Sequence, residues 1–333
     1  MTHIDHDILI IGAGMAGLSC AVHLRSAGHQ VALIDKGRGP GGRMAARRVE
    51  IAGQAISFDH GAQYFTARDP EFRAAVARWE AAGAVAQWPV GGDEAFVGVP
   101  GMNGPVKAMA SGLDVRWGVR AKRLVCGDAA WRIDSDAGEI SARCVLVAVP
   151  AEQASDLLIE SAPGLAAIAG GVSSAPCWAL LAAFDEPVPL SADSLRSEGT
   201  IAWAARNSSK PGRAAAETWV IHASPQRSRE LIDLPKEAAA TVLLEDFCKL
   251  AELGELPKTL HLAAHRWLYA LPQVAAGPPA HFDAALRLGI AGDYLHSPRV
   301  EGAWISGRML AGLSLDRTQA LLAASDEIDG NAG

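Results

Sequence analysis

Cysteine, positive charge and long hydrophobic runs are all scarce in this sequence. Its five cysteines are scattered over 333 residues without a C-x-x-C pair, which argues against a disulfide framework or a zinc site and fits reduced thiols. No apolar run approaches the ~20 residues of a membrane-spanning helix. The opening residues lack the basic flank and apolar core of a signal peptide. We therefore expect a cytoplasmic protein with no membrane partner.

The charge balance is acidic. Thirty Lys and Arg residues stand against 37 Asp and Glu residues, which gives a net charge of −7. Because contacts with phosphate backbones need a basic surface, this balance argues against a nucleic-acid partner. Half of the residues are hydrophobic and 20% are charged, so the chain can bury a core and is not disordered. Its length fits one large domain or two of ordinary size.

The strongest motif is a glycine-rich turn between a predicted strand and a predicted helix. The β-branched run 8–11 predicts a buried strand, and residues 18–27 predict a helix. Between them stand three glycines with the G-x-G-x-x-G spacing: Gly12, Gly14 and Gly17. The next predicted strand ends at Asp35, 18 residues after the last glycine. This β-α-β pattern is typical of the opening of a doubly wound parallel sheet.

The chemistry of that pattern is dinucleotide binding. Glycines allow a tight turn and a close approach of the backbone to a pyrophosphate, and the helix N-terminus offers unpaired N–H groups with partial positive charge. A carboxylate at the position of Asp35 can hold ribose hydroxyls. A purely structural turn is the alternative.

Two further segments extend this site. Arg38 and Arg43 stand among glycines directly after the second strand and can bind pyrophosphate or ribityl oxygens with paired hydrogen bonds, unless the loop is simply solvated. Gln63 can hydrogen-bond the edge of a flavin, with Tyr64 and Phe65 lining a planar pocket. A core strand with an incidental polar residue is the alternative there.

Near the end of the chain, Asp293 follows a predicted strand at 288–292, where ligands bind in open α/β sheets. A helix is predicted to begin near Arg299, and its positive end would favour a reduced, anionic flavin ring. An ordinary capped surface helix is the alternative.

One strand of the middle region alternates rings with other residues. His265, Trp267 and Tyr269 would share a face of that strand and form a slot for a flat molecule, or they would serve sheet packing. Trp203, Arg206 and Asn207 are further pocket candidates. The sequence holds no H-E-x-x-H, P-loop or G-x-S-x-G motif. We therefore predict no metal site and no nucleophile, and expect a cofactor to carry the chemistry.

The two ends of the chain predict one nucleotide-binding unit, with a more β-rich unit inserted into it. The predicted cofactor domain comprises residues 1–75, 106–150 and 285–328. The predicted substrate domain comprises residues 76–105 and 151–284.

These segments together resemble the renalase family of flavoproteins, in its bacterial branch, nearly from end to end. The resemblance rests on the glycine motif with Asp35 and on these later segments: 38–44, 61–69, 100–102, 203–211, 265–270, 292–293 and 299–304. The stretches 64–66 and 265–267 are the most specific. The first two motifs are shared with many flavin amine oxidases and hydroxylases.

The resemblance implies an α/β fold like that of p-hydroxybenzoate hydroxylase: a doubly wound, Rossmann-like domain that binds FAD non-covalently, with an inserted mixed β-sheet substrate domain. The residues it implies as FAD contacts are Gly12, Gly14, Met15, Ala16, Gly17, Asp35, Lys36, Arg38, Gly42, Arg43, Met44, Gln63, Tyr64, Leu124, Asp293, Arg299, Val300, Glu301 and Ala303. The residues it implies as substrate contacts are Tyr64, Phe65, Thr66, Ala67, Arg68, Pro100, Gly101, Met102, Trp203, Asn207, His265, Trp267 and Tyr269.

It also implies an activity, the repair of misreduced nicotinamide dinucleotides. The 1,2-dihydro isomers of NAD(P), with the 1,6-dihydro isomers as further substrates, are oxidised to NAD(P)+, and O2 takes the electrons to give H2O2. A dinucleotide and O2 are thus the expected partners. Hydride transfer from a dihydropyridine removes no proton from carbon, so no general base is expected. Tyr64, Trp203, Trp267 and Tyr269 would shape the ring slot, and Asn207 and His265 would bind the carboxamide.

Two other functions stay open. A flavin amine oxidase would share the first motifs, but such enzymes usually hold a lysine near flavin N5. None of the seven lysines stands in an apolar context that predicts burial. The third reading is a FAD-binding module without turnover that responds to redox state, although no tail, heptad repeat or charge block supports it.

Overall fold

The computed structural model describes residues 4–329, with side chains up to residue 315. By its internal contacts the chain forms two units. Unit 1 holds the described residues of Met1–Gly42, Met109–Ser173 and Pro272–Gly333, and unit 2 holds Arg43–Ala108 and Ser174–Leu271. No helix among the described residues has the length and apolar character needed to cross a membrane.

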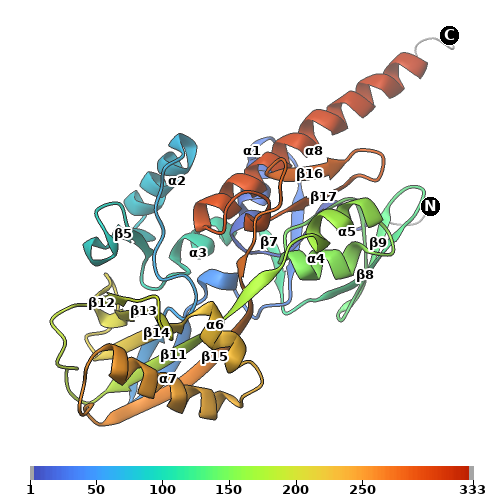
Figure 1. The fold of residues 1–333 in the computed structure, drawn as a ribbon. Helices are drawn as coiled ribbons and strands as arrows, with labels where there is room; N and C mark the ends of the chain where they lie inside the picture. The colour runs from blue at the N-terminus through green and yellow to red at the C-terminus, as the bar shows by residue number, and fades with distance from the viewer. Residues whose placement is uncertain (1–3, 330–333) are drawn as a thin grey trace. The chain divides into compact units, whose positions relative to one another are not determined.

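Unit 1 is built on an eight-stranded sheet whose centre is parallel (Figure 1). Its main path runs β16 (Ala280–Asp283), β17 (Leu288–Ala291), β10 (Gly138–Val147), β1 (His6–Ile11), β2 (Val31–Asp35) and β7 (Asp114–Trp117). The antiparallel pair β8 (Ala121–Cys126) and β9 (Trp131–Ser135) joins this sheet through β10. Ile8 pairs with Val31 on one side and with Cys144 on the other. Burial on both faces explains the unbroken apolar run of β1.

Two helices from opposite ends of the sequence pack together in unit 1, as Figure 1 shows. They are α1 (Met15–Ser26) and α8 (Val300–Asp329). The Ser19 hydroxyl donates to the carbonyl of Trp304 at 2.7 Å. A Cβ on Gly307 would lie only 2.0 Å from the carbonyl oxygen of Ala16, so glycine lets the two backbones touch.

A second helical layer of unit 1 consists of α4 (Ala151–Leu158) and α5 (Pro163–Gly170). Leu158 and Leu165 are buried in one cluster with Leu9, Val145 and Ile290 of the sheet. These helices therefore complete the core of the nucleotide-binding fold.

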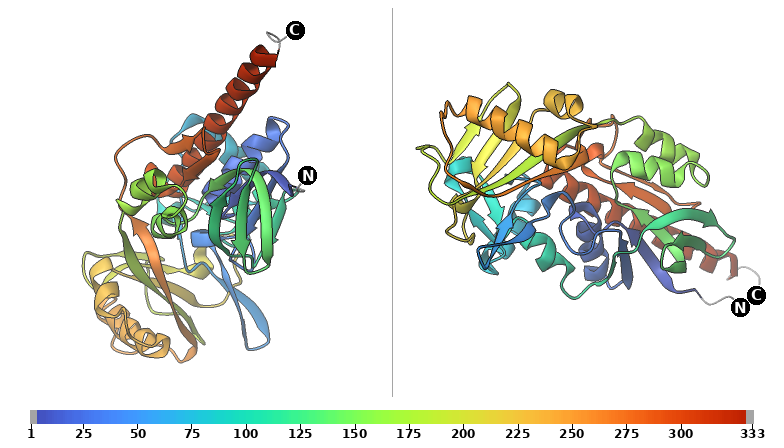
Figure 2. Two further views of the ribbon diagram at one scale, coloured as in Figure 1. Left: turned by 90° about the vertical axis from the view of Figure 1, so that its right-hand side faces the viewer. Right: turned by 90° about the horizontal axis from the view of Figure 1, so that it is seen from below.

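Unit 2 is built on a five-stranded sheet. Its order is β12 (Ser194–Arg196), β13 (Ile201–Arg206), β14 (Thr218–Ala223), β11 (Ser174–Phe184) and β15 (Thr259–Pro272). Helices α6 (Pro225–Glu230) and α7 (Lys236–Leu250) accompany it, and Figure 2 shows α7, in orange, along one face of the sheet. Leu243 and Phe247 of α7 pack against Leu180 and Trp219.

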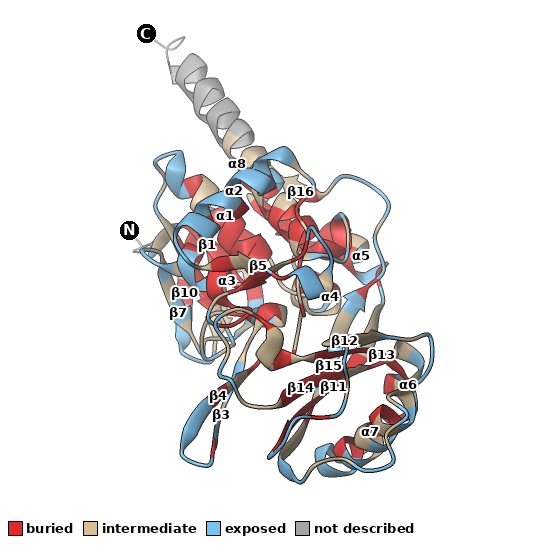
Figure 3. Cartoon of the chain, turned by 90° about the vertical axis from the view of Figure 1, so that its left-hand side faces the viewer, coloured by how far each residue is buried: buried red, intermediate tan, exposed pale blue. Residues whose placement is uncertain are grey.

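The other face of this sheet meets the hairpin of β3 (Arg47–Ile51) and β4 (Gln54–Phe58). Ile56 and Phe58 pack against Leu181 and Val220. Neighbouring residues 180 and 181 thus face opposite sides, which follows from the two-residue period of a strand. Figure 3 shows the buried central strands in red and the exposed far end of the hairpin in pale blue.

The remaining elements of the chain are short. The helices are α2 (Pro70–Ala81) and α3 (Gly104–Ala110), and a second hairpin joins β5 (Val85–Gln87) to β6 (Phe96–Gly98). Single 3-10 turns form at η1 (Gly42–Met44), η2 (Pro89–Gly91), η3 (Asn207–Ser209) and η4 (Asp293–Leu295).

The predicted fold class is confirmed. The strand predicted at 31–35 has those bounds, and the helix predicted at 18–27 begins three residues earlier, directly after Gly14. Gly28 follows that helix with a φ of 91°, as a left-handed C-terminal glycine should. The helix predicted to begin near Arg299 runs from Val300 to Asp329.

The predicted division of the chain differs from the two units at residues 106–108, which belong to unit 2, and at three longer segments. Residues 43–75 belong to unit 2, because the β3–β4 hairpin packs on the unit 2 sheet. Residues 151–173 belong to unit 1, because α4 and α5 pack on its sheet. Residues 272–284 also belong to unit 1, because β16 pairs with β17.

Candidate functional site

Unit 1 carries a cradle of backbone groups at the turn between β1 and α1. Gly12 has a φ of 104°, and a Cβ there would lie 2.4 Å from the carbonyl oxygen of Ala148. A Cβ on Gly17 would lie 1.8 Å from the carbonyl oxygen of Gly12, whereas one on Gly14 would meet nothing within 4 Å. Close packing thus requires two of the glycines. The third leaves open space at the start of α1, where a pyrophosphate can reach free N–H groups.

Asp35 ties this glycine turn to the loop after β2. One of its carboxylate oxygens accepts from the backbone N–H of Ala13 at 2.7 Å. The other accepts from the N–H of Gly37 at 2.6 Å. Because an ionised carboxylate has about four acceptor positions, capacity for two further donors remains. This arrangement fits the predicted role of binding ribose hydroxyls.

The loop after β2 returns to the glycine turn. Gly42 has a φ of 54°, and a Cβ there would lie 3.7 Å from the Cα of Gly14. Lys36 donates to the side-chain oxygen of Gln153 at 2.6 Å, and partial burial lowers the pKa of Lys36. Arg38 is exposed, with no hydrogen bond to the rest of the described chain, so its guanidinium is available to a phosphate.

The carboxyl end of unit 1 supplies the other half of the cradle. The N–H of Gly292 donates to the Ser306 hydroxyl at 2.8 Å, which holds the end of β17 against α8. Asp293 follows and is buried, and α8 begins at Val300 directly after the exposed Arg299. Two other expected FAD contacts are buried in the first turn of this helix: Glu301 and Ala303.

Three expected FAD contacts have side chains that face the core. Met15, Ala16 and Leu124 are buried, and Leu124 packs in the cluster around Leu9 and Ile133. Their backbone groups, rather than their side chains, are available to a cofactor. For Met15 and Ala16 this agrees with a site built from backbone groups. Leu124 can contact the cofactor only through the backbone of β8.

Arg43 and Met44 lie in unit 2, just past the border between the units. The carbonyl of Arg43 accepts from the N–H of Ala62 at 2.8 Å. A Cβ on Gly61 would lie 2.0 Å from that same carbonyl oxygen. Gly61 therefore lets segment 43–44 pass against segment 61–62, and Met44 is buried there.

Unit 2 contains a buried charge network centred on Asp59. One oxygen of Asp59 lies 3.3 Å from Lys210 Nζ and 3.1 Å from Arg213 Nε, and the other accepts from the N–H of Met102 at 2.8 Å. Lys210 also donates to Gln63 Oε1 at 3.0 Å. The three ionic side chains are at most 1% exposed. Two cations thus share one carboxylate out of contact with water.

Burial shapes the protonation of this network. Loss of hydration alone would raise the pKa of Asp59, but Lys210 and Arg213 outweigh it and hold the pKa of that carboxyl below its ordinary value. Burial lowers the pKa of Lys210 to about 8, against the opposing effect of Asp59. Lys210 is thus buried although its sequence context gave no indication of burial. Lys210 lies in a polar stretch of sequence, and its burial depends on a partner 151 residues away.

Gln63 and Asn207 are engaged with the protein itself. Gln63 Nε2 donates to the carbonyls of Asp59 and, at 3.1 Å, Gly61. Asn207 accepts from the N–H of Asp59 at 3.2 Å and donates to the carbonyl of Ser57 at 2.8 Å. Asn207 thus fastens η3 to the end of β4. The prediction that it binds a substrate carboxamide is not supported.

A cluster of rings lies on β15. His265 and Trp267 share a face of the strand, as predicted, with ring centroids 4.5 Å apart, and Tyr269 follows in the same alternation. His60 stacks on Trp267 at 5.1 Å and meets His265 edge-on at 4.7 Å. Burial lowers the pKa of both His60 and His265 to about 4. Both imidazoles are therefore neutral at neutral pH.

A second ring group, the aromatic cluster, consists of Tyr64, Trp88 and Trp203. Tyr64 lies 5.6 Å from Trp203 and 6.3 Å from Trp88, and the two tryptophans are 6.4 Å apart between ring centroids. Arg196 covers this group. Its guanidinium carbon lies 4.6 Å from the Trp203 ring centroid, and Nη2 donates to the Tyr64 hydroxyl at 2.7 Å.

Phe65 faces away from the aromatic cluster. It is 4% exposed and packs against Phe72 of α2 and Phe96 of β6. The prediction that Phe65 lines a planar pocket beside Tyr64 is therefore wrong, because adjacent residues of an extended chain point to opposite sides.

The other predicted substrate contacts lie in the loops of unit 2. The carbonyl of Ala67 accepts from the Arg73 side chain at 3.0 Å, and the side chain of Asp69 caps the start of α2. Met102 is fully buried and bonds to Asp59 through its backbone. The remaining predicted contacts are placed in the same two loops, 64–69 and 99–104: Thr66, Arg68, Pro100 and Gly101.

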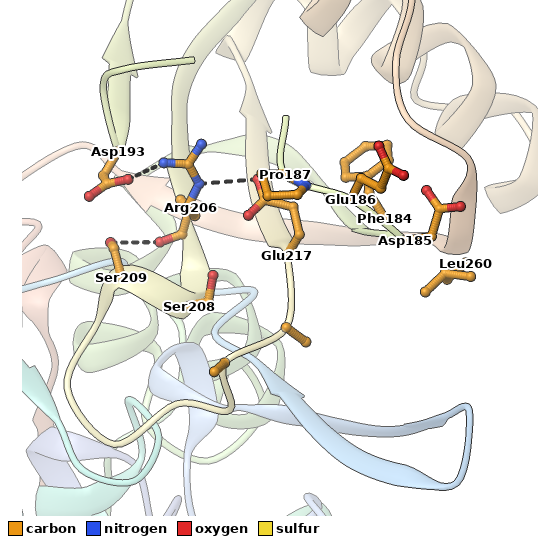
Figure 4. Close-up of a pocket in the computed structure, with 12 residues that line it drawn as sticks. Phe184, Asp185, Glu186, Pro187, Asp193, Arg206, Ser208, Ser209, Glu217 and Leu260 are labelled. Carbon is orange, nitrogen blue, oxygen red and sulfur yellow. Dashed lines mark hydrogen bonds and ion pairs between the residues drawn. The ribbon is translucent and has the colours of Figure 1, made fainter. Parts of the chain in front are cut away.

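Arg206 is not a free cation. It lines a hollow of about 540 Å³ in unit 2, together with Asp185, Glu186 and Leu260. Figure 4 shows its guanidinium between Asp193 and Glu217. Two further bonds go to the carbonyls of Val188 and Leu190. The role of Arg206 is therefore to hold the loop before β12.

Sequence reasoning missed six residues of unit 2 that the structure brings together. They are Asp59, His60, Trp88, Arg196, Lys210 and Arg213. No local signal marks them, because each partner lies in a different segment. Only the pairing of a buried carboxylate with basic residues elsewhere could have indicated the network.

Comparisons with known proteins agree with this architecture. Two solved structures resemble the chain in fold. An engineered triple mutant of putrescine oxidase is 14% identical, with a TM-score of 0.68, and the match covers 94% of this chain and 99% of the oxidase. Cyclohexylamine oxidase from Brevibacterium oxydans IH-35A is 11% identical, with a TM-score of 0.64, and the match covers 95% of this chain and 100% of the oxidase. Hydroxyneurosporene desaturase from Rubrivivax gelatinosus is 41% identical over 63 residues, which are 19% of this chain and 11% of the desaturase.

Family models cover most of the sequence. Residues 10–79 match the NAD(P)-binding Rossmann-like domain, which contains the glycine turn and Asp35. Residues 80–313, more than two thirds of the chain, match the model of flavin containing amine oxidoreductases. The cofactor is FAD, and its dinucleotide fits the cradle of unit 1. The chain belongs to the family of flavin containing amine oxidoreductases.

Proposed function

We propose that this protein is a renalase-like oxidase that restores NAD(P)+ from its 1,2-dihydro isomers, with 1,6-dihydro isomers as further substrates. In this proposal the cradle of unit 1 holds FAD without a covalent bond. The start of α1 binds the pyrophosphate, Asp35 binds ribose, Arg38 approaches the phosphates, and Asp293 binds the ribityl chain. FAD when bound supplies the two-electron acceptor that O2 regenerates, with release of H2O2.

The observation that carries the proposal is the ring cluster of His60, His265 and Trp267. Neutral imidazoles offer hydrogen bonds to a carboxamide without adding charge, and the indole offers a flat surface. His60 Nδ1 is buried and has no partner among the described residues. A substrate amide would satisfy it. These groups suit a dihydropyridine ring that carries a carboxamide.

The reaction also fits the lack of a strong base in this cluster. Conversion of a dihydropyridine to a pyridinium needs loss of a hydride but no loss of a proton from carbon. The residues of unit 2 then need only to position the ring and exclude water. Histidines with pKa values of about 4 are poor bases at neutral pH and good neutral hydrogen-bond partners.

Anaerobic rapid mixing of the holoenzyme with purified dihydro isomers tests the proposal. Bleaching of the flavin should be fast with the 1,2-dihydro isomer and slow with ordinary 1,4-dihydro NADH. Replacement of His265 by Asn, which keeps a hydrogen-bonding side chain, should slow bleaching less than replacement by Leu. Equal slow bleaching by every donor would contradict the proposal.

One observation favours a second function, amine oxidation. Lys210 is fully buried and its pKa is lowered by burial, which is the environment of a lysine placed for chemistry. Its neighbours are Asp59 and Arg213, however, so it is paired within a buried charge network. Release of aldehyde and ammonia from a primary amine would establish this function. A panel of primary and secondary amines that leaves the flavin oxidised would exclude it.

A further inference from the structure

Arg196 differs from the other arginine on its part of the sheet. Arg206, ten residues later, is held by two carboxylates and two carbonyls. Arg196 is exposed and, among the residues that the structure describes, has no carboxylate within ion-pair distance. One of its donors goes to the Tyr64 hydroxyl. Because a guanidinium has five N–H donors, four remain for a ligand.

A second unused donor lies directly beneath it. Trp203 is 9% exposed, and its indole N–H is buried with no acceptor among the described residues. Trp203 is the cross-strand partner of Arg196 in the β12–β13 pair, so both side chains stand on one face of the sheet. An unpaired buried N–H costs free energy, and an incoming acceptor removes that cost.

The charge around the aromatic cluster is positive. Lys210 Nζ lies 5.4 Å from the ring centroid of Trp88, which places the Asp59 network beside the cluster. Lys210, Arg213 and Arg196 carry three positive charges in this region; among the described residues Asp59 pairs with Lys210 and Arg213, and no carboxylate pairs with Arg196. An anion gains from this field, and an ammonium group loses.

The cluster also offers flat apolar surface. Trp88 and Trp203 meet edge-on, at an interplanar angle of 69°, and Tyr64 is tilted by 41° to Trp203. Together the group presents one planar fork for oxygens, one indole N–H and the half-buried ring of Tyr64, while Trp88 is fully buried behind them. The ligand that matches all of these features carries phosphate next to a flat or sugar-like body.

We propose that Arg196, with the indole N–H of Trp203, binds the diphosphate of the dinucleotide substrate. This inference rests on the proposed function and deepens it, because it states how the enzyme distinguishes a dinucleotide from a bare nicotinamide riboside. Arg196 acts as a specificity-determining residue that positions the substrate through its diphosphate.

The test compares two substrates in the holoenzyme. Arg196→Gln should raise KM for the 1,2-dihydro isomer of NAD at least tenfold with little change in kcat. It should leave both constants for 1,2-dihydronicotinamide riboside, which lacks phosphate, unchanged. Arg196→Lys should recover part of the loss, because it restores the charge but not the fork. Arg229→Gln, at an exposed arginine of α6, is the matched control and should behave as the wild type.

Salt and binding measurements complete the test. Added salt should raise KM for the dinucleotide in the wild type and have little effect in Arg196→Gln. ADP-ribose, the non-reacting part of the substrate, should bind the oxidised holoenzyme and should bind at least tenfold more weakly after Arg196→Gln. Trp203→Phe keeps a ring and removes the N–H, and it should weaken ADP-ribose binding a few-fold.

The outcomes separate this inference from the proposed function. If the wild type oxidises dihydro isomers but Arg196→Gln affects both substrates equally, or neither, the inference is overturned and the function stands. If no dihydro isomer reacts while ADP-ribose binding depends on Arg196, the function fails and the anion site remains supported. If ADP-ribose does not bind, or binds both forms equally, the phosphate site is overturned.

Discussion

The two units build their sites from different materials. In unit 1 the cradle consists of backbone N–H groups, glycine Cα atoms and one carboxylate, and nearly all of it comes from the first 42 residues and the start of α8. In unit 2 the site consists of side chains: two ring clusters, the exposed guanidinium of Arg196 and a buried charge network. A backbone site suits a constant ligand such as FAD, because it depends on the path of the chain. A side-chain site can change its ligand by substitution.

The comparison predicts that substitutions destabilise the two units in different ways. A change in unit 1 should act through backbone clashes, whereas a change in unit 2 should act through uncompensated charge or lost burial. Three experiments test this difference between the units, in order of decreasing expected effect.

Asp59→Asn should have the largest effect. It leaves Lys210 and Arg213 buried together without a counter-ion, which should cost about 3–5 kcal/mol of unfolding free energy. Urea unfolding of the holoenzyme measures the loss. Lys210→Met is the matched variant, since Asp59 keeps Arg213, and should cost much less. A larger loss for Lys210→Met than for Asp59→Asn would show that the network is not held by this carboxylate.

Gly17→Ala should have the next largest effect. Its Cβ would lie 1.8 Å from the carbonyl oxygen of Gly12, so the turn must shift, at about 3 kcal/mol. FAD content and the melting temperature measure the change. Gly14→Ala is the control, because its Cβ meets no protein atom within 4 Å. It should preserve the fold and reduce only cofactor affinity. Equal melting temperatures for the two variants would refute the assignment of a packing role to Gly17.

The effect of His60 is the smallest at neutral pH and grows as the pH falls. Its folded-state pKa of about 4 lies below the ordinary 6.5, so the unfolded chain takes up the proton first as the pH falls. Stability should be fully present above pH 6.5 and decrease toward pH 4, by about 3 kcal/mol from this group. His60→Phe cannot be protonated and should flatten that decrease. Removal of the exposed His296 should not. If the free energy of unfolding of His60→Phe decreased between pH 6.5 and pH 4 as much as that of the wild type, His60 would not be a buried neutral imidazole.

The sequence predicts the site of unit 1 better than the site of unit 2. The first strand, the glycine turn, Asp35 and the start of α8 were all predicted, because each is specified by neighbours within a few residues. Three local patterns indicate these features: a run of β-branched residues, a glycine at a position without space for a Cβ, and a carboxylate at the end of a strand.

The unit 2 site could be predicted only in part. The shared face of His265 and Trp267 follows from alternation on one strand. The Asp59 network does not, because it joins residues 59, 63, 102, 210 and 213 through folding alone. Lys210 illustrates the difficulty. A lysine between serines and a proline predicts a solvated turn, and only the distant carboxylate makes its burial tolerable.

Tyr64 and Phe65 were predicted to line the same pocket, although the sequence already indicates that their side chains point to opposite sides. Tyr64 and Phe65 are adjacent, so the alternation of an extended segment sends them to opposite sides. Tyr64 reaches Arg196, and Phe65 reaches Phe72. The choice between them depends on which side the hairpin of β5 and β6 lies, and that is tertiary information.

The contact of Gly307 with Ala16 has a consequence for biosynthesis. Helix α1 packs against α8, which begins some 290 residues later in the chain. This contact cannot form until α8 has left the ribosome. Such sequence-distant pairing is slow to form and leaves apolar surface uncovered on the nascent chain. Unit 2, whose strands are complete before α8 is made, can therefore mature first. Truncation within α8 should produce a polypeptide that depends on chaperones and aggregates, rather than a shorter enzyme.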